Sequence, residues 1–234
     1  MPKPVKISKS DITKLQIIRV ATKNFLENGY SNTSAKKICD ELGISPGNLT
    51  FYFPTKEHLL ATLVDLLCDF QWKMMKEEAD DGISSIMAIC LELTAMTAMC
   101  DEDEIARDFY ISTYTSPICL DRIRRNDADR AKKVFKEYCP NWTDEQFAMA
   151  EMLVSGAEYA ALVQAGYQVS LEMRIEGALR NILRIHNVPE DLIKLKIDKV
   201  FALDYRSIGR KVLKKFKEFA EAENENAFIE LFGG

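Results

Sequence analysis

Residues 33–60 read TSAKKICDELGISPGNLTFYFPTKEHLL, and the first part of this stretch has the signals of one short helix. Thr33 or Ser34 can accept hydrogen bonds from the backbone amides that a helix start leaves unpaired. Gly43 tolerates the left-handed backbone conformation that commonly ends a helix. Apolar residues between them recur at three- and four-residue spacing and give the helix one apolar face; they are Ala35, Ile38 and Leu42.

A second short helix is expected directly after this turn, over residues 45–52. Ser45 can cap it, and Pro46 suits its first position, where a missing amide proton costs no hydrogen bond. Gly47 and Asn48 are small residues near its N-terminus, so its backbone amides can approach a phosphate or a base edge closely. Two short helices joined by a glycine turn are the layout of a helix-turn-helix that binds the major groove of DNA.

The residues on both sides of the motif follow a recognisable pattern. Within a helix predicted over residues 10–28, the pattern extends from Ile17 through Phe25 and leads into Gly29 and Tyr30. Further positions of the pattern follow without an insertion, at Thr33, Ile38, Gly43, Ile44, Ser45, Gly47, Leu49, Tyr52, Phe53, Lys56, Glu57 and Leu59. In these residues, which fall between positions 10 and about 75, the chain resembles the tetracycline-repressor (TetR) family of bacterial regulators.

The resemblance implies a DNA-binding transcriptional regulator, in particular a repressor that binds a palindromic operator as a homodimer and responds to a small-molecule effector. It also implies a helix-turn-helix domain over residues 1–54, with its motif at 34–53, and a helical regulatory, effector-binding and dimerisation domain over 55–234. Two residues depart from the family pattern. Thr50 replaces an aromatic residue that often contacts a phosphate, and Pro46 replaces a common lysine, so we expect weaker nonspecific affinity or a changed operator sequence.

The composition predicts a folded cytoplasmic protein. The chain has 234 residues, of which 47% are apolar, enough for a small domain and a larger one. No apolar run approaches the roughly 20 residues of a membrane span, and the polar N-terminal residues do not read as a signal peptide. Six cysteines without a CxxC pair indicate reduced side chains and argue against a structural zinc site.

Charge is distributed unevenly along the chain. Residues 1–60 contain nine Lys or Arg and five Asp or Glu, a net charge of +4, whereas the whole chain carries −5. Residues 61–234 therefore carry −9. Positive charge accompanies the motif, as binding to phosphates requires, although chance variation of a solvated surface also produces such differences.

Helical periodicity recurs along the chain between short Gly, Pro, Asn or Asp breaks, and hardly any stretch alternates like a strand. The sequence predicts an all-α fold in which a long fourth helix joins a three-helix helix-turn-helix domain to a C-terminal helical domain for ligand binding and dimerisation. At about 1.5 Å per residue, the fourth helix spans about 36 Å and can act as a lever. The predicted helices cover residues 10–28, 34–41, 45–52, 55–80, 83–100, 102–114, 117–138, 143–166, 170–187 and 190–221.

The candidate DNA-binding residues lie at the ends of the two short helices. The residues expected to face bases are Ser45, Gly47, Asn48 and Phe51, and Ser34 and Pro46 belong to the same helix starts. Contacts with phosphates, which set register rather than sequence, are expected from Thr33, Thr50, Tyr52 and Lys56.

The middle of the chain concentrates soft and aromatic side chains, which can line an adaptable cavity with a few hydroxyl groups. Such residues also form ordinary cores, and an effector pocket is expected mainly because the resemblance implies one. The candidates for this pocket are Trp72, Met87, Cys90, Phe109, Tyr110, Tyr114, Tyr138 and Tyr159.

Two helices past the middle of the larger domain, at 143–166 and 170–187, occupy the place where the family pairs into a four-helix dimer interface. Their small and aliphatic residues suit such an interface, but they also suit the core of any helical protein. The helix at 190–221 lies past the usual end of the family pattern. The candidate dimer residues are Gly156, Ala160, Leu171, Ile175, Leu179 and Ile182.

The chain has a poor inventory for catalysis. His58 and His186 are its two histidines, and they fall in separate helices. No GxxxxGK[ST], GxGxxG, GxSxG or HExxH motif occurs, so we expect no enzyme activity, metal or cofactor. The alternative hypothesis is a protein with the same resemblance that has lost DNA binding and acts through a protein partner, an option that Thr50 leaves open.

Overall fold

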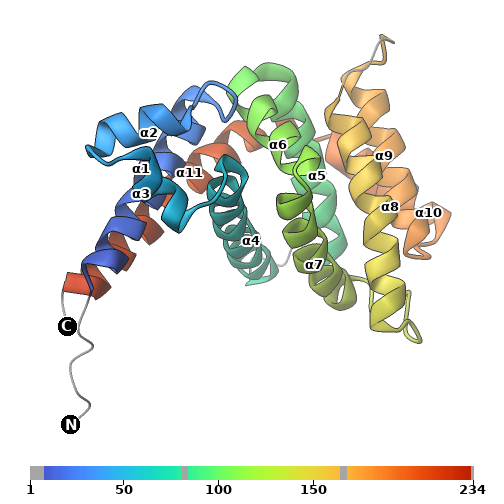
Figure 1. The fold of residues 1–234 in the computed structure, drawn as a ribbon. Helices are drawn as coiled ribbons and strands as arrows, with labels where there is room; N and C mark the ends of the chain where they lie inside the picture. Colours follow the sequence, from blue (N-terminus) through green and yellow to red (C-terminus); the bar gives the residue numbers. More distant parts are fainter. Residues whose placement is uncertain (1–7, 81–83, 164–167, 233–234) are drawn as a thin grey trace.

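The computed structural model describes residues 8–80, 84–163 and 168–232, and these ranges contain eleven helices and no strand (Figure 1). The predicted all-α fold is confirmed. The first three helices form a head at one side, and the others form a body beside it. The helices are α1 (Lys9–Asn28), α2 (Ala35–Leu42), α3 (Pro46–Tyr52), α4 (Lys56–Asp80), α5 (Ser85–Glu102), α6 (Glu104–Thr115), α7 (Pro117–Val134), α8 (Asp144–Leu162), α9 (Leu171–Ile185), α10 (Glu190–Phe201) and α11 (Tyr205–Phe232).

The local signals of the head act as the sequence predicts. Ser34 Oγ accepts a hydrogen bond from a backbone amide in the first turn of α2 at 3.1 Å, so Ser34 rather than Thr33 is the cap. Gly43 ends α2 with a φ of 64°, in the left-handed region. Ser45 Oγ caps α3 in the same way as Ser34 caps α2, at 3.2 Å. These caps fix the angle between the two short helices.

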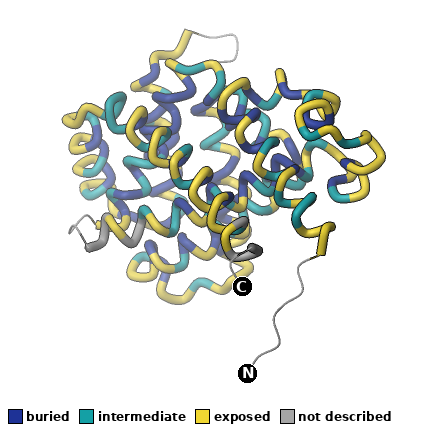
Figure 2. Tube along the Cα trace, turned by 90° about the vertical axis from the view of Figure 1, so that its left-hand side faces the viewer, coloured by how far each residue is buried: buried dark blue, intermediate teal, exposed yellow. Residues whose placement is uncertain are grey.

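One apolar core runs through the head and the body (Figure 2). In the head, Ile17 and Phe25 of α1 are fully buried, and Leu49 is the buried residue of α3. In α4, Leu60 and Leu63 are also fully buried and belong to the same cluster. Burial of one apolar face on every helix is the main stabilising contribution to this fold.

The long helix α4 leaves the head and enters the body, as predicted. It packs against α1 of the head and against α7 and α11 of the body. Arg122 of α7 donates a hydrogen bond to the carbonyl oxygen of Ala61 at 3.0 Å and forms an ion pair with Asp65. The start of α4 is therefore held by both parts of the molecule.

The predicted single helix over 190–221 is wrong, because the chain breaks at 202–204 and forms two helices, α10 and α11. Asp204 accepts a hydrogen bond from the backbone amide of Ser207 at 3.1 Å, which makes it a new helix start. The break contains neither glycine nor proline, so the sequence had no strong stop signal there.

The last helix, α11, returns across the body to lie beside α1 (Figure 1). Gly209 lets it approach α5 closely, because a Cβ at this position would lie 2.9 Å from the carbonyl oxygen of Ala95. Phe216 is buried, with its ring centre 5.5 Å from that of Phe70 and 6.2 Å from that of Phe109. The helix therefore belongs to the core and connects the body to the head.

A polar contact also joins the head to α6. Asp108 accepts hydrogen bonds from the hydroxyl and from the backbone amide of Ser31, the latter at 2.8 Å. Gly29, in the same loop, has a φ of 87°, and a Cβ there would lie 2.8 Å from the Asp108 carboxylate. The loop between α1 and α2 therefore follows any movement of α6.

The position of α11 in the core can be tested by substitution. We expect Phe216→Ala to lower the free energy of unfolding by about 3–5 kcal/mol, because it leaves a cavity between α4, α6 and α11. Lys215→Ala, at the neighbouring exposed position, is the control and is expected to change it by less than about 0.5 kcal/mol. Urea unfolding of both variants measures the difference, and equal stabilities would contradict the assignment.

Candidate nucleic-acid interface and regulatory cavities

The second helix of the motif, α3, exposes most of its side chains. Leu49 is 3% exposed and anchors it, whereas Phe51 is 78% exposed and turns its ring to solvent. The major groove of DNA is about 12 Å wide and accepts a helix of this kind. Besides Phe51, the exposed residues at or near α3 are Ser45, Pro46, Gly47, Asn48 and Thr50.

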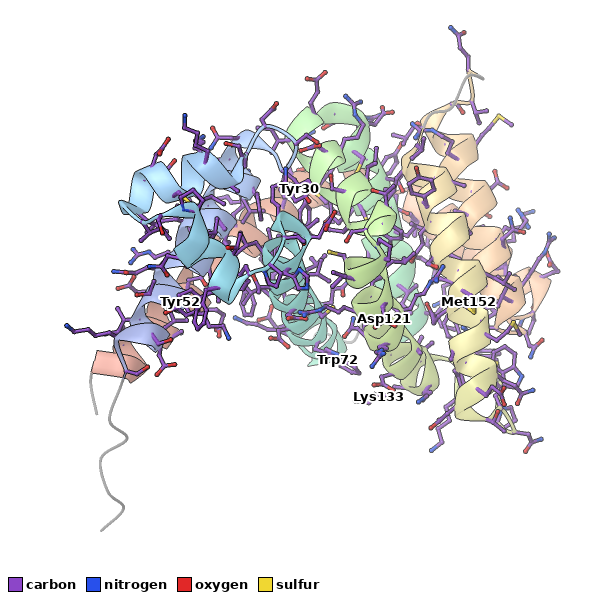
Figure 3. All side chains as sticks on the ribbon, in the orientation of Figure 1. Tyr30, Tyr52, Trp72, Asp121, Lys133 and Met152 are labelled. Atoms are coloured by element: carbon purple, nitrogen blue, oxygen red, sulfur yellow. The ribbon has the colours of Figure 1, made fainter. Side chains whose placement is uncertain are left out.

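Tyr52 keeps its hydroxyl group at the surface of the head (Figure 3). The hydroxyl donates a hydrogen bond to Ser10 Oγ of α1 at 3.0 Å, and the ring packs edge-on against Phe51 with centres 5.0 Å apart. The start of α1 is therefore adjacent to the end of α3. The sequence analysis missed Ser10, because a contact between such distant positions has no local signal.

Thr50 uses its hydroxyl proton within the helix. Its Oγ1 lies 3.1 Å from the carbonyl oxygen of Pro46, a distance at which it donates a hydrogen bond. The proton is then not available to a phosphate.

The expectation that Thr33 contacts a phosphate is wrong. Thr33 is fully buried, and its hydroxyl donates to the carbonyl oxygen of Gly29 at 2.8 Å. Its side chain therefore cannot reach DNA. The residue instead fixes the loop between α1 and α2.

Lys56 is largely committed to the same loop. Its Nζ donates to the carbonyl oxygens of Tyr30 at 2.9 Å and of Thr33 at 3.1 Å, and lies 3.9 Å from the centre of the Tyr30 ring. Burial lowers the pKa of Lys56. With two of its three protons in use, Lys56 positions the head rather than serving as a free phosphate anchor.

Lys36 is a candidate that the sequence analysis missed. It lies in the first turn of α2, where it is exposed, and the Ser34 cap is two positions before it. The positive end of the α2 dipole lies at the same place. The lysine charge and the helix dipole therefore both favour binding of a phosphate. The sequence signal that could have identified Lys36 was a lysine two positions after a predicted helix cap.

The body contains two adjoining cavities. The first, of about 50 Å³, lies between α4, α5, α6, α7, α8 and α9, and we call it the acidic cavity. The second, of about 80 Å³, lies between α4, α5, α6, α7 and α11, and we call it the apolar cavity. Residues that line the acidic cavity and not the apolar one include Asp127, Glu151, Glu158 and His186, whereas Glu92 and Arg130 line both. Residues that distinguish the apolar cavity are Phe70, Met74, Met99, Val212, Leu213 and Phe216.

Of the residues predicted to line an effector pocket, two line these cavities and the others do not. Tyr110 lines both cavities and Tyr114 lines the acidic one. Trp72 donates a hydrogen bond to Asn126 Oδ1 at 2.7 Å, and Lys133 Nζ lies 4.0 Å from its ring (Figure 3). The remaining candidates line neither cavity; they are Met87, Cys90, Phe109, Tyr138 and Tyr159. The predicted soft and aromatic residues lie on several different helix faces, so they do not all point into one cavity.

The two helices expected to form a dimer interface expose two of the six residues predicted for it. Gly156 and Ala160 lie on the exposed face of α8, as a dimer interface requires. The predicted residues of α9 are wrong, because that face packs into the body; they are Leu171, Ile175, Leu179 and Ile182. The large apolar residues that are exposed on these helices are Met149, Met152 and Leu153 of α8 and Met173 of α9 (Figure 3 labels Met152).

Other kinds of site receive no support within the described ranges. There, no three His, Cys, Asp or Glu side chains are arranged to hold a metal ion. The six cysteines are unpaired, and five of them are buried. None of the helices in the same ranges has both the length and the apolar character needed to cross a membrane.

The family model described as bacterial regulatory proteins, tetR family, matches residues 17–63, which extend from α1 into α4. The chain is 34% identical over 80 residues to the uncharacterized HTH-type transcriptional regulator YuxN of Bacillus subtilis (strain 168), a match that covers 34% of this chain and 28% of that protein. It is 38% identical over 52 residues to the HTH-type transcriptional regulator UidR of Escherichia coli (strain K12), covering 22% of this chain and 26% of UidR. The match therefore spans only about a quarter of these curated relatives.

Solved structures with a similar chain path have low scores. GusR of Salmonella enterica has a TM-score of 0.44 at 20% identity, covering 80% of this chain and 97% of GusR. TylP, a TetR regulator from Streptomyces fradiae, has a TM-score of 0.45 at 17% identity, covering 86% of this chain and 95% of TylP. The similarity to the tetR family of bacterial regulatory proteins therefore depends on the amino-terminal match, which covers residues 17–63 of this chain.

Proposed function

We propose that this protein is a transcriptional regulator that inserts α3 into the major groove of duplex DNA. The observation that carries this proposal is the exposure of α3, on which Leu49 alone is buried while Asn48 and Phe51 face solvent. A helix attached in this way at an edge of the molecule has most of its surface available to a groove. The family match over residues 17–63 supports the same interpretation.

Two groups of side chains divide the proposed contacts with DNA. The candidates for base contacts are Ser45, Gly47, Asn48 and Phe51, among which Asn48 can make a bidentate contact with adenine. Contacts with phosphates fix the position of the head on the duplex. The candidates for phosphate contacts are Ser34, Lys36 and Tyr52, with Pro46, Thr50 and Lys56 in supporting positions.

We propose that a second copy of this chain covers the exposed apolar face of α8 and α9. On this face, Met149, Met152 and Leu153 are 51%, 59% and 54% exposed, and Met173 is 67% exposed. Gly156 and Ala160 continue the α8 face and allow a close approach of helices. Matching the same patch on two copies gives a two-fold symmetric dimer. Such a dimer presents two heads to half-sites about 34–36 Å apart on a palindromic operator.

An effector in the body can influence the head through three routes. Helices α4 and α11 both line the apolar cavity and both pack against α1. Helix α6 lines the acidic cavity through Tyr114 and holds the head loop through Asp108 and Ser31. A ligand with unequal affinity for two spacings of the heads would shift the population between DNA-binding and released states. We therefore propose a ligand-responsive repressor.

The alternative function, action through a protein partner without DNA binding, predicts a different result in a simple experiment. A pool of random duplexes is incubated with the protein, and retained sequences are identified. Enrichment of a two-fold symmetric site supports the proposed function. Absence of any enriched sequence at low salt would overturn it and favour the alternative.

The division between base and phosphate contacts leads to a prediction for two variants. We expect Asn48→Ala to cost about 1–3 kcal/mol on the enriched site and to relax its sequence preference. Lys36→Ala is expected to weaken binding to specific and random duplexes alike, and to reduce the slope of log affinity against log salt by about one. Fluorescence anisotropy at several salt concentrations measures both effects. An unchanged salt slope for Lys36→Ala would refute its assignment.

The proposed dimer leads to a second prediction. Met152→Glu places a charge in the centre of the apolar face, so we expect it to convert the dimer to monomers in analytical ultracentrifugation. Leu195→Glu is the matched control, because Leu195 is 47% exposed on α10, outside this face. Dimers that persist in Met152→Glu, or dissociate equally in the control, would be incompatible with the proposed interface.

A further inference from the structure

The acidic cavity contains more negative than positive side chains. Four carboxylates line it, from Glu92, Asp127, Glu151 and Glu158, against the single guanidinium group of Arg130. An uncompensated carboxylate in such a place costs free energy, since burial removes its hydration. The excess therefore requires an explanation.

Arg130 pairs with two of these carboxylates through its two terminal nitrogens. It forms an ion pair with Glu92 and a second one with Asp127 at 3.2 Å. Arg124, the other arginine close to the cavity, donates its Nε proton to Ser155 Oγ at 2.8 Å. No ion pair with an arginine or lysine is therefore found for Glu151 or Glu158 in the described part of the chain.

His186 adds an unused acceptor to the same cavity. Its Nδ1 lies 2.9 Å from the carbonyl oxygen of Ile182, which assigns the ring proton to Nδ1. Its Nε2 is then unprotonated and carries a lone pair that can accept a hydrogen bond. This atom is buried and has no hydrogen-bond partner among the described residues. The residue is 1% exposed, and Nε2 lies 4.0 Å from a carboxylate oxygen of Glu151. At this distance the two groups are close but not hydrogen-bonded to each other.

Protonation explains how the empty cavity tolerates this arrangement. Burial, together with the charge of Asp127, raises the pKa of Glu151 to about 9 and the pKa of Glu158 to about 8. Burial lowers the pKa of His186. At neutral pH, both glutamates therefore carry protons and the imidazole is neutral. A cation that enters the cavity can replace those protons.

Aromatic and apolar groups surround Glu158 and His186. Tyr114 donates a hydrogen bond to Glu158 at 2.8 Å, and the ring of Phe135 stacks on that of His186 at 4.0 Å. Leu67 and Tyr110 line both cavities, so the acidic cavity adjoins the apolar one directly. The combined space offers charge to one end of a guest and hydrocarbon to the other.

We propose that the effector is an organic cation, an amine or quaternary ammonium with an apolar tail, whose charged end lies between Glu151, Glu158 and His186. Its tail extends beside Leu67 into the apolar cavity, against Phe216 of α11. The inference rests on the proposed function, because it names the ligand class of the same regulatory body. Aromatic faces and carboxylates together are the usual recognition elements for such cations.

The test compares three compounds with the same apolar body and different charge: 4-phenylbutylamine, 4-phenylbutanol and 4-phenylbutyrate. Calorimetric titration of the full-length protein is expected to give at least about tenfold tighter binding of the amine than of the alcohol or the acid. Equal or tighter binding of the alcohol or the acid would overturn the proposal, as would no binding of the amine.

Substitutions locate the charged end. Glu151→Gln and Glu158→Gln are each expected to weaken amine binding by about tenfold or more. Both variants should fold, because glutamine resembles the protonated glutamate of the empty cavity; thermal melting checks this. Glu145→Gln is the control, since Glu145 lies exposed on the same helix. Unchanged affinity in both cavity variants would exclude this position for the cation.

The pH dependence supplies a readout that a merely structural role would not change. The trimethylammonium derivative of 4-phenylbutylamine does not titrate, so any change reflects the protein. The groups that face Glu151 and Glu158 are Glu92, Tyr114, Arg124, Asp127, Arg130 and His186. Affinity is expected to rise from pH 6 to pH 8, by up to about tenfold per pH unit for each proton released, and to level off near pH 9. A flat profile would contradict the proposal.

Failure of this inference can be separated from failure of the proposed function. Binding of the ligand-free protein to its enriched duplex is measured in the same preparation. If the duplex is bound and the amine is not, the DNA-binding function stands and the cationic effector is excluded. If the amine binds, the cavity variants weaken its binding, and no duplex is bound, the ligand class stands and the regulatory function fails.

Discussion

The apolar core shared by the head and the body is the constraint on which the remaining features depend. Because α4 and α11 contribute buried residues to this core and also pack against α1, the head cannot move independently of the walls of the apolar cavity. Asp108 adds a hydrogen-bonded connection from α6 to the loop after α1. A close-packed interior resists gradual deformation, so a guest between these helices is expected to select between discrete arrangements of the head.

The ionisable residues buried inside the body lower the stability that the apolar core provides. Arg130 is compensated by Glu92 and Asp127, whereas Glu151 and Glu158 remain uncharged at neutral pH because burial raises their pKa values. Apolar residues of similar size would make a more stable core. Buried ionisable groups with shifted pKa values beside a cavity are typical of functional sites, where function outweighs the cost in stability.

Sequence analysis succeeded where local interactions determine structure and failed where neighbours in space determine it. The caps Ser34 and Ser45 and the turn at Gly43 were predictable, because each acts within a few residues. The buried position of Thr33 depends on the carbonyl oxygen of Gly29, which has no local signature. The candidate effector residues had the same difficulty: hydrophobic spacing indicates that a side chain is buried, but it does not indicate which cavity it lines.

The chain's pattern of caps, breaks and apolar spacing was enough to establish an all-α protein with an N-terminal helix-turn-helix, since these signals are short-range. Assignment of helix faces required the folded chain. On α9, apolar periodicity identified Ile175 and Leu179 correctly as one face, yet that face packs into the body and leaves Met173 exposed. An amphipathic helix satisfies its pattern equally well against its own chain or against a partner, and long-range packing selects between them.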